Sequence, residues 1–272
     1  MHKKVNRIIL LLIIQLNFIS CSAQDIIPII QSGRYSNEIS SKGEHYYFLA
    51  RYYIDRENKN IIDLRSLEKG INRVVKDADY SGYIILDIEN KIYQELKKET
   101  IEHKNYHKNI NAFVEMVKMV KDLRPKAKVG VYGFPFNFNF PAQKKNNDFE
   151  KLKPLLKTVD FFAPQIYLYY TEEERPVDFF DNYITNNLSL YFEYAEKLNK
   201  KVYPFVWYKI HPYNKKYGDN VIEPKLYSSY INNIKNFRYK EKKVEKIIYW
   251  EPSAETVDLD EKFKETIKLL KQ

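Results

Sequence analysis

Two carboxylates stand at the end of an apolar stretch in the first third of the chain. Gly82–Leu86 is followed directly by Asp87-Ile88-Glu89. Because side chains alternate along a strand, Asp87 and Glu89 should point to the same side, roughly 6–7 Å apart. A neighbouring carboxylate and partial burial raise the pKa of one member of such a pair, as a general acid working near neutral pH requires. The alternative is a solvated strand end whose carboxylates cap the next helix.

Aromatic residues favour a carbohydrate ligand for this acid pair. Trp207 and Trp250, the only tryptophans, both fall at the ends of apolar stretches. Sugar rings present apolar C–H faces, so aromatic side chains form platforms for them. The alternative is core packing, because the chain holds 24 Tyr and 16 Phe.

Other catalytic signatures are weak or missing. His103 and His107 have helical i, i+4 spacing without the glutamate of HExxH, which favours a solvated face. His45 and His211 are lone residues. There is no G-x-S-x-G or Walker motif, and a single cysteine argues against a Cys-rich zinc site. We therefore expect neither a metal nor a cofactor.

Apolar stretches alternate with helical periods over the chain. The predicted strands are Ile26–Ile30, Tyr46–Tyr53, Gly82–Ile88, Lys128–Tyr132, Asp160–Tyr167, Lys201–Tyr208 and Glu245–Trp250. Apolar residues at helical spacing predict helices at Leu64 to Ala78, Ile110 to Val120, Phe179 to Leu188, Leu226 to Ile234 and Phe263 to Leu270. Strand and helix in alternation predict a parallel sheet with helices outside it.

The strand ends distinguish an open doubly wound sheet from a closed α/β barrel. A nucleotide-binding open sheet would carry G-x-G-x-x-G after its first strand, and the chain has none. A barrel brings its strand ends together on one face, where barrel enzymes place their active sites. The polar and aromatic residues at these ends are Asp87, Glu89, Tyr132, Gln165, Tyr167, Trp207, Tyr208, Trp250 and Glu251. We therefore predict an α/β barrel.

The N-terminus is typical of an exported protein. Basic residues Lys3, Lys4 and Arg7 precede the apolar run Ile8–Ile14, which is too short to span a bilayer. The residues before Cys21 resemble a bacterial lipobox, with Phe18 in place of the usual leucine. We expect a signal peptide at 1–20 and a lipid anchor at Cys21 that ties the protein to the membrane of the cell envelope. A soluble secreted protein cut nearby is the alternative.

The mature chain, 21–272, is expected to be a single domain without disulfides, since it has one cysteine and no linker-like segment. Its formal charge falls from +9 to +6 when Lys3, Lys4 and Arg7 are removed (9 − 3 = 6). A positive surplus suits an acidic partner. The basic residues are scattered among acids and the chain is expected outside the cell, so an anionic polysaccharide is favoured over nucleic acid.

Five segments in order resemble the hyaluronidases of glycoside hydrolase family 56. Asp87-Ile88-Glu89 lies where that family has D-W-E. The other four are Gly130–Pro135 (GVYGFP), Phe162–Leu168 (FAPQIYL), Val202–Lys209 (VYPFVWYK) and Ile247–Trp250 (IIYW). The resemblance runs from about residue 46 to residue 250.

The resemblance implies a distorted TIM-like barrel of about seven parallel strands. It implies a retaining, substrate-assisted mechanism in which Glu89 protonates the glycosidic oxygen and then activates water. The N-acetyl oxygen of the substrate attacks the anomeric carbon, while Asp87 and Tyr167 orient the amide. Tyr132 and Trp250 would shape the sugar pocket, with Trp207, Tyr208 and Gln165 as further substrate contacts from their strand-end positions.

The chain departs from the family after Glu89, where D-W-E-x-W-R-P reads Asp87-Ile88-Glu89-Asn90-Lys91-Ile92-Tyr93. The family's tryptophans and arginine are lost here, and Asn137 replaces one of its disulfide cysteines. Three other interpretations stay open. They are a chitinase-like barrel, a lysozyme-like barrel with Asp25 as the nearest further acid, and a non-catalytic glycan-binding lipoprotein.

Overall fold

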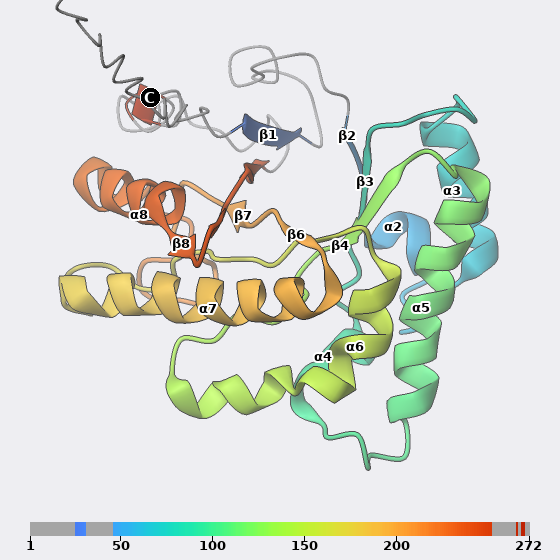
Figure 1. Ribbon diagram of the computed structural model, residues 1–272, viewed down its shortest axis with the longest axis horizontal. Coiled ribbons are helices and arrows are strands. Elements are labelled where there is room, and N and C mark those ends of the chain that lie inside the picture. Colours follow the sequence, from blue (N-terminus) through green and yellow to red (C-terminus); the bar gives the residue numbers. More distant parts are fainter. Residues whose placement is uncertain (1–24, 31–45, 252–264, 266–267, 270–272) are drawn as a thin grey trace, which may run out of the picture.

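The computed structural model describes residues 25–30, 46–251, 265 and 268–269 (Figure 1). The expected signal peptide and Cys21 lie outside the described residues. So do Phe263, Ile267 and Leu270 of the last predicted helix.

The strands are short and, with one exception, parallel. β1 (Asp25–Ile30) pairs with β10 (Lys246–Glu251), which pairs with β7 (Phe205–Val206). A second sheet holds β2 (Tyr46–Leu49), β3 (Tyr83–Leu86) and β4 (Lys128–Val131) in that order. β5 (Phe161–Phe162) pairs with β6 (Lys201–Val202), and the antiparallel exception is β8 (Arg238–Tyr239) with β9 (Lys242–Lys243).

Isolated parallel bridges connect these sheets. Tyr132 pairs with Ala163, and Gln165 pairs with Phe205. Among the described residues β1 contacts β2, but no backbone ladder joins them. The predicted parallel α/β architecture is therefore confirmed, whereas the hydrogen-bonded strands do not form a closed barrel.

The helices lie outside the strands, with α7 and α8 on one side of the molecule and α3 and α5 on the other (Figure 1). The predicted helices are α3 (Leu64–Val74), α5 (Tyr106–Leu123), α7 (Val177–Leu198) and α8 (Pro224–Asn236). The structure adds α2 (Arg51–Ile54), α4 (Lys91–Lys98), α6 (Phe149–Thr158) and the 3₁₀ helix η1 (Pro141–Asn147). No helix in the described ranges is both long enough and apolar enough to cross a membrane.

The three longest predicted strands end early in the structure, and proline explains two of them. Proline has no N–H to donate to a ladder. Pro164 therefore follows the end of β5, and Pro204 separates β6 from β7. The third strand, predicted to reach Tyr53, ends at Leu49 because the chain turns into α2 at Arg51.

The core forms between strands and helices as the apolar pattern requires. Ile84, Ile85 and Leu86 are fully buried in β3, as expected for a parallel strand covered on both faces. Phe113 and Val117 present the buried face of α5. This packing fixes the end of β3, where the two carboxylates follow.

Candidate active site

Asp87 and Glu89 reach the same pocket from the end of β3. The backbone N–H of Asp87 donates to Leu49 O at 3.0 Å, which extends the β2–β3 pairing by one residue. Ile88 points into the core and is 1 % exposed. The residues on either side of it therefore face the opposite way, and both line the pocket.

The pocket has a volume of about 160 Å³. Its lining residues are Phe48, Asp87, Glu89, Tyr132, Tyr167, Trp207, His211, Pro212 and Trp250. Sites for drug-sized ligands are larger, roughly 300–1,000 Å³, so this one fits a single ring or substituent of a polymer.

Two larger hollows lie elsewhere, with volumes of about 520 Å³ and 400 Å³. The acids that line the first, Glu172, Glu173 and Glu223, are exposed. The smaller pocket is the better catalytic candidate, because it joins interacting carboxyl groups of raised pKa to aromatic walls.

Burial and mutual repulsion set the charge state of the pair. Burial, and then the charge of Glu89, raise the pKa of Asp87 well above its ordinary value. Desolvation also raises the pKa of Glu89, and the nearby cation of Lys97 opposes that shift. Glu89 is nonetheless exposed at the mouth, where water can reach it. Two interacting carboxyl groups of this kind favour the state with one proton on the pair over the state in which both are ionised.

Two polar atoms of the pocket residues have no partner within the described chain. Asp87 Oδ1 is enclosed and accepts no hydrogen bond, and Trp207 Nε1 is enclosed and donates none. Leaving such atoms unsatisfied costs about 1–3 kcal/mol each, and more for a charged group. An amide, with one N–H donor and one C=O acceptor, has the complementary groups.

A series of buried hydrogen bonds positions Tyr132 and Tyr167, the two tyrosines that line the pocket. Tyr132 Oη donates to Gln165 Oε1 at 2.9 Å, and Gln165 Nε2 donates to Asn137 Oδ1 at 3.2 Å. Asn137 Nδ2 donates to Tyr183 Oη at 3.4 Å, and that hydroxyl donates to Tyr167 O at 2.9 Å. Burial raises the pKa of Tyr132 and of Tyr167, so both phenols stay protonated hydrogen-bond donors.

The sequence-predicted residues therefore separate into two groups. Glu89, Asp87, Tyr132, Tyr167, Trp207 and Trp250 come together around the pocket. Gln165 does not line it, because it lies behind Tyr132 and is 3 % exposed. Tyr208 also lies outside the lining, stacked on Tyr249 with ring centroids 6.0 Å apart.

Sequence reasoning missed two basic residues near Glu89. Lys97 is half-buried in α4, and its charge acts on both Glu89 and His211. Burial and Lys97 lower the pKa of His211 to about 4, so its ring is neutral at neutral pH. His211 Nδ1 accepts from Tyr213 N at 3.2 Å, which leaves Nε2 to carry the proton. The sequence offered little sign of either residue, since α4 was not predicted and His211 stands alone.

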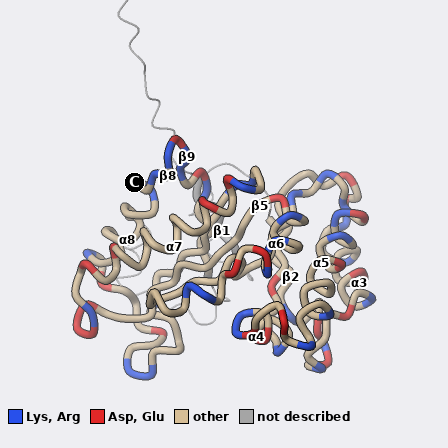
Figure 2. The backbone as a smooth tube through the Cα atoms, turned by 60° about the horizontal axis from the view of Figure 1, so that its bottom comes forward, with Lys and Arg blue, Asp and Glu red and all other residues tan. Residues whose placement is uncertain are grey.

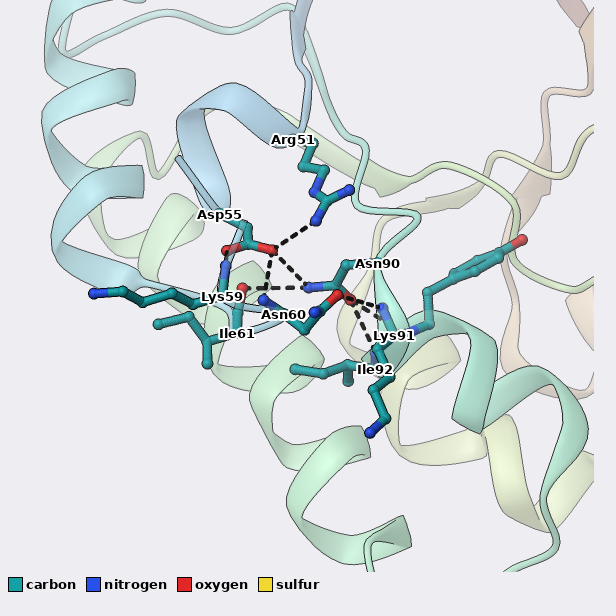
Figure 3. Close-up of polar contacts among 9 residues, drawn as sticks. Arg51, Asp55, Lys59, Asn60, Ile61, Asn90, Lys91 and Ile92 are labelled. Carbon is teal, nitrogen blue, oxygen red and sulfur yellow. Dashed lines mark hydrogen bonds and ion pairs between the residues drawn. The ribbon is translucent and has the colours of Figure 1, made fainter. Parts of the chain in front are cut away.

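Asn90, immediately after Glu89, connects the end of β3 to α2 through hydrogen bonds. Its side chain accepts from the N–H groups of Ile92 and Tyr93, at 3.0 Å and 3.4 Å, and so caps α4. Its amide donates to Asp55 Oδ2 and to Ile61 O, each at 3.3 Å. Figure 3 shows Asp55 and Asn90 facing each other between the two segments.

Asp55 is a buried acceptor for several donors. It is 2 % exposed and also accepts from Arg51, Lys59 N and Asn60 N, at 3.3, 2.8 and 3.0 Å (Figure 3). Asn90 and Lys91 lie in the segment 87–93, where the sequence differs from the hyaluronidase motif, and Lys91 N donates to Asn60 Oδ1 at 3.1 Å. No group of three or more His, Cys, Asp or Glu in the described residues could hold a metal ion.

Comparisons with known proteins show a similarity to hyaluronidases. A salivary hyaluronidase of Lutzomyia longipalpis is 25% identical over 199 residues, covering 54% of this chain and 52% of that protein. The chain thus spans about half the length of this curated relative. No protein-family model matches the chain.

Two solved structures of bee venom hyaluronidase share the fold. One, in complex with a hyaluronic acid tetramer, has a TM-score of 0.62 and 16% identity, covering 92% of this chain and 96% of that chain. The other, a monoclinic crystal form, has a TM-score of 0.65 and 15% identity, covering 92% and 100%. The resemblance to hyaluronidases that the motifs indicated is confirmed.

Proposed function

We propose that the protein is a glycoside hydrolase that cleaves β-linked N-acetylhexosaminides in a glycosaminoglycan-like polysaccharide such as hyaluronan or chondroitin. The observation that carries the proposal is one pocket that holds a solvent-reachable carboxyl, Glu89, together with an enclosed carboxyl oxygen, Asp87 Oδ1, that has no partner among the described residues. The likeness to hyaluronidases, one of them bound to a hyaluronic acid tetramer, supports this substrate class. It also supports a distorted TIM-like barrel of about seven strands as the scaffold.

Substrate binding would place the shared proton on Glu89. A hydrogen bond to a carboxylate favours its charged form. An acetamido N–H donating to Asp87 Oδ1 would therefore lower the pKa of Asp87, and the proton would stay with Glu89. Glu89 is then the acid and Asp87 the anion, as the reaction requires.

The reaction proceeds in two displacements at the anomeric carbon. First, the Glu89 proton passes to the glycosidic oxygen, the bond from that oxygen to the anomeric carbon breaks, and the acetamido oxygen bonds to the carbon from the opposite face. Asp87 stabilises the positive charge of this oxazolinium intermediate. Glu89 then takes a proton from water, whose oxygen displaces the acetamido oxygen. Two inversions leave the configuration retained.

The aromatic residues take supporting roles in this scheme. Tyr167, with its phenol protonated, donates toward the acetamido oxygen, and Trp207 Nε1 is a second available donor. Tyr132 and Trp250 form walls for the sugar beside the scissile bond. Gln165 acts through Tyr132, and Tyr208 supports the wall from the core.

Glu89→Gln tests the proposal, because it keeps the shape of the side chain and removes the proton donor. We expect release of reducing ends from hyaluronan, unsulfated chondroitin or chitin oligomers to fall about 10²–10⁴-fold. Glu115→Gln, on the exposed face of α5, is the matched control and should keep full activity. Wild-type turnover by Glu89→Gln, or inversion of the product observed by proton NMR, would refute the mechanism. Binding without turnover by the wild type would favour a non-catalytic glycan-binding protein.

We further propose that the mature protein is exported and held at the cell envelope by lipid on Cys21. The order of basic tip, apolar run and cysteine supports this proposal. An anchored hydrolase would act on polymer outside the cell, where anionic polysaccharide is accessible.

A further inference from the structure

A second hollow, of about 400 Å³, lies between α2 and α3 and is basic. It is here called the α2–α3 groove, and its lining residues are Tyr52, Tyr53, Arg56, Glu57, Asp63, Arg65, Ser66, Lys69, Gly70 and Arg73. Four of them are cations, and all four are exposed. None of these residues lines the catalytic pocket.

Gly70 allows the two helices to come close enough to form the groove. A Cβ at this position would lie 2.9 Å from Tyr53 Cδ1, closer than real Cβ atoms approach. A glycine inside a helix costs about 1 kcal/mol relative to alanine, because it has more backbone freedom to lose. The absent side chain lets the Tyr53 ring pack directly on α3 and form the floor.

The cations of α3 form a single ridge along the groove. Arg65, Lys69 and Arg73 are spaced at i, i+4 and i+8, so they follow one face at about 6 Å per step. Lys, Arg, Asp and Glu are interspersed along most of the chain (Figure 2), which makes this ridge a local feature.

The positive charge of the groove is not neutralised by ion pairs among the residues that the structure describes. In the described part of the chain, no ion pair within 4.0 Å reaches Arg56, Arg65, Lys69 or Arg73. The two acids of the lining are already engaged. Asp63 accepts from Arg65 N, Ser66 N and Ser66 Oγ at the start of α3, and Glu57 pairs with Lys59.

The residue types favour carboxylate or sulfate groups carried on sugar rings. The described chain has seven arginines among its many lysines, and Arg56, Arg65 and Arg73 line this groove. A guanidinium forms paired hydrogen bonds with two oxygens of one carboxylate or sulfate group, which lysine cannot do. Tyr52 is 53% exposed, with the Arg56 guanidinium carbon 5.4 Å from its ring centroid, and its exposed ring surface offers a platform for a sugar.

We propose that the α2–α3 groove is a second glycan-binding site, which holds an acidic polysaccharide chain outside the catalytic pocket. The choice of acidic polysaccharide over other polyanions rests on the proposed function. The groove adjoins the catalytic face, because α2 begins two residues after β2, whose Phe48 lines the pocket. Asp55, at the end of α2, is also bonded to Asn90 beside Glu89. One polymer chain could therefore engage both sites, which would concentrate substrate at the pocket.

The test is a charge reversal measured by binding rather than by turnover. The double variant Lys69→Glu, Arg73→Glu is made in a Glu89→Gln background, so that polymer is not cut. Binding of long fluorescent hyaluronan and chondroitin is followed by anisotropy at about 0.1 M salt, where charges act over about 10 Å. We expect the dissociation constant to rise about tenfold or more, since two attractive contacts become repulsive. The matched control is Lys108→Glu, Lys225→Glu, which carries the same change in net charge on exposed sites of α5 and α8.

Several outcomes would overturn the proposal. One is equal weakening by the groove and control variants, which would show an effect of net charge alone. Another is unchanged binding by the groove variant and by Tyr52→Ala, an exposed substitution that leaves the core intact. Equally tight, groove-dependent binding of single-stranded DNA or of vesicles with anionic lipid would overturn the assignment to glycans.

The groove and the active site can be judged separately. In protein that keeps Glu89 and is therefore active, the double variant Lys69→Glu, Arg73→Glu should raise KM for long polymer several-fold. It should leave KM and kcat for a short oligomer unchanged. Groove-dependent binding of polymer by a wild type that turns over no substrate would support the second site and refute the proposed hydrolase. Turnover with binding independent of the groove would do the reverse.

Discussion

Asn90→Ala removes the residue that fixes the backbone directly after Glu89. The asparagine side chain makes four hydrogen bonds and is 3 % exposed. Loss of the two capping bonds to α4 costs about 1 kcal/mol. Loss of the buried amide that donates to the Asp55 carboxylate costs about 1.5–3 kcal/mol, at the lower end because Asp55 keeps three other donors.

We therefore expect the free energy of unfolding to fall by about 2–4 kcal/mol in urea denaturation. For a chain of this size that corresponds to a drop in Tm of about 5–15 °C. Below that Tm, kcat should fall as much as about 100-fold, because an ångström of displacement at Glu89 spoils proton delivery. Asn90→Ser restores the cap without the bridge to Asp55, so it should lie between alanine and wild type.

Asn105→Ala is the matched control, because Asn105 precedes α5 but makes no capping bond with its side chain. It donates to Glu95 at 3.2 Å, and its loss should cost less than about 1 kcal/mol with activity intact. Wild-type stability of Asn90→Ala would refute the energetic reasoning. Full activity in a destabilised Asn90→Ala would refute the claim that the cluster positions Glu89.

Three further changes test the charges and the anchor. Asp87→Asn should abolish activity and stabilise the fold at pH 7, because the folded-state pKa of Asp87 is raised and its ionisation opposes folding. The gain in stability should vanish below the ordinary pKa of 3.8, where the carboxyl is protonated in both the folded and the unfolded state. Urea denaturation at both pH values measures this difference. Lys97→Met removes a cation that lowers the pKa of Glu89, so the alkaline limb of kcat should move to higher pH, whereas Lys98→Met should move it less. Cys21→Ser should shift the protein from the membrane fraction to the soluble exported fraction, and unchanged membrane association would contradict the lipid anchor.

Features set by local sequence could be predicted, and features set by long-range packing could not. The D-x-E strand end follows from an apolar run and the alternation of strand side chains, and α5 follows from its periodic apolar face. The predicted lengths of the strands that contain Pro164 and Pro204 were wrong, because proline lacks the N–H that a strand ladder needs, even within an apolar run. α4 is short, and its start depends on Asn90, whose partners Asp55 and Ile61 lie about thirty residues away in sequence.

The same distinction explains which site residues the sequence could identify. Asp87, Glu89 and Trp250 follow strands, and parallel strand ends converge. Lys97 lies in a helix and His211 in a loop, so the convergence of strand ends could not predict that they lie near Glu89. Gln165 was predicted at a strand end, but its side chain accepts a hydrogen bond from Tyr132 and donates one to Asn137. These contacts, which the sequence does not reveal, direct it away from the pocket lining.

The contrast between satisfied and unsatisfied polar groups is the strongest physical argument for what the pocket binds. Asn90 and Gln165 are buried, and each uses both the oxygen and the nitrogen of its amide in hydrogen bonds. In the same neighbourhood Asp87 Oδ1 and Trp207 Nε1 have no partner in the described chain. A fold that satisfies its amides but keeps an enclosed carboxylate oxygen unpaired carries a stability cost that substitution by asparagine could relieve. An N–H of the substrate would supply the missing partner, which makes the acetamido group a requirement for turnover. A hexosamine polymer from which the acetyl groups have been removed should therefore not be cleaved, even where it binds the walls of the pocket.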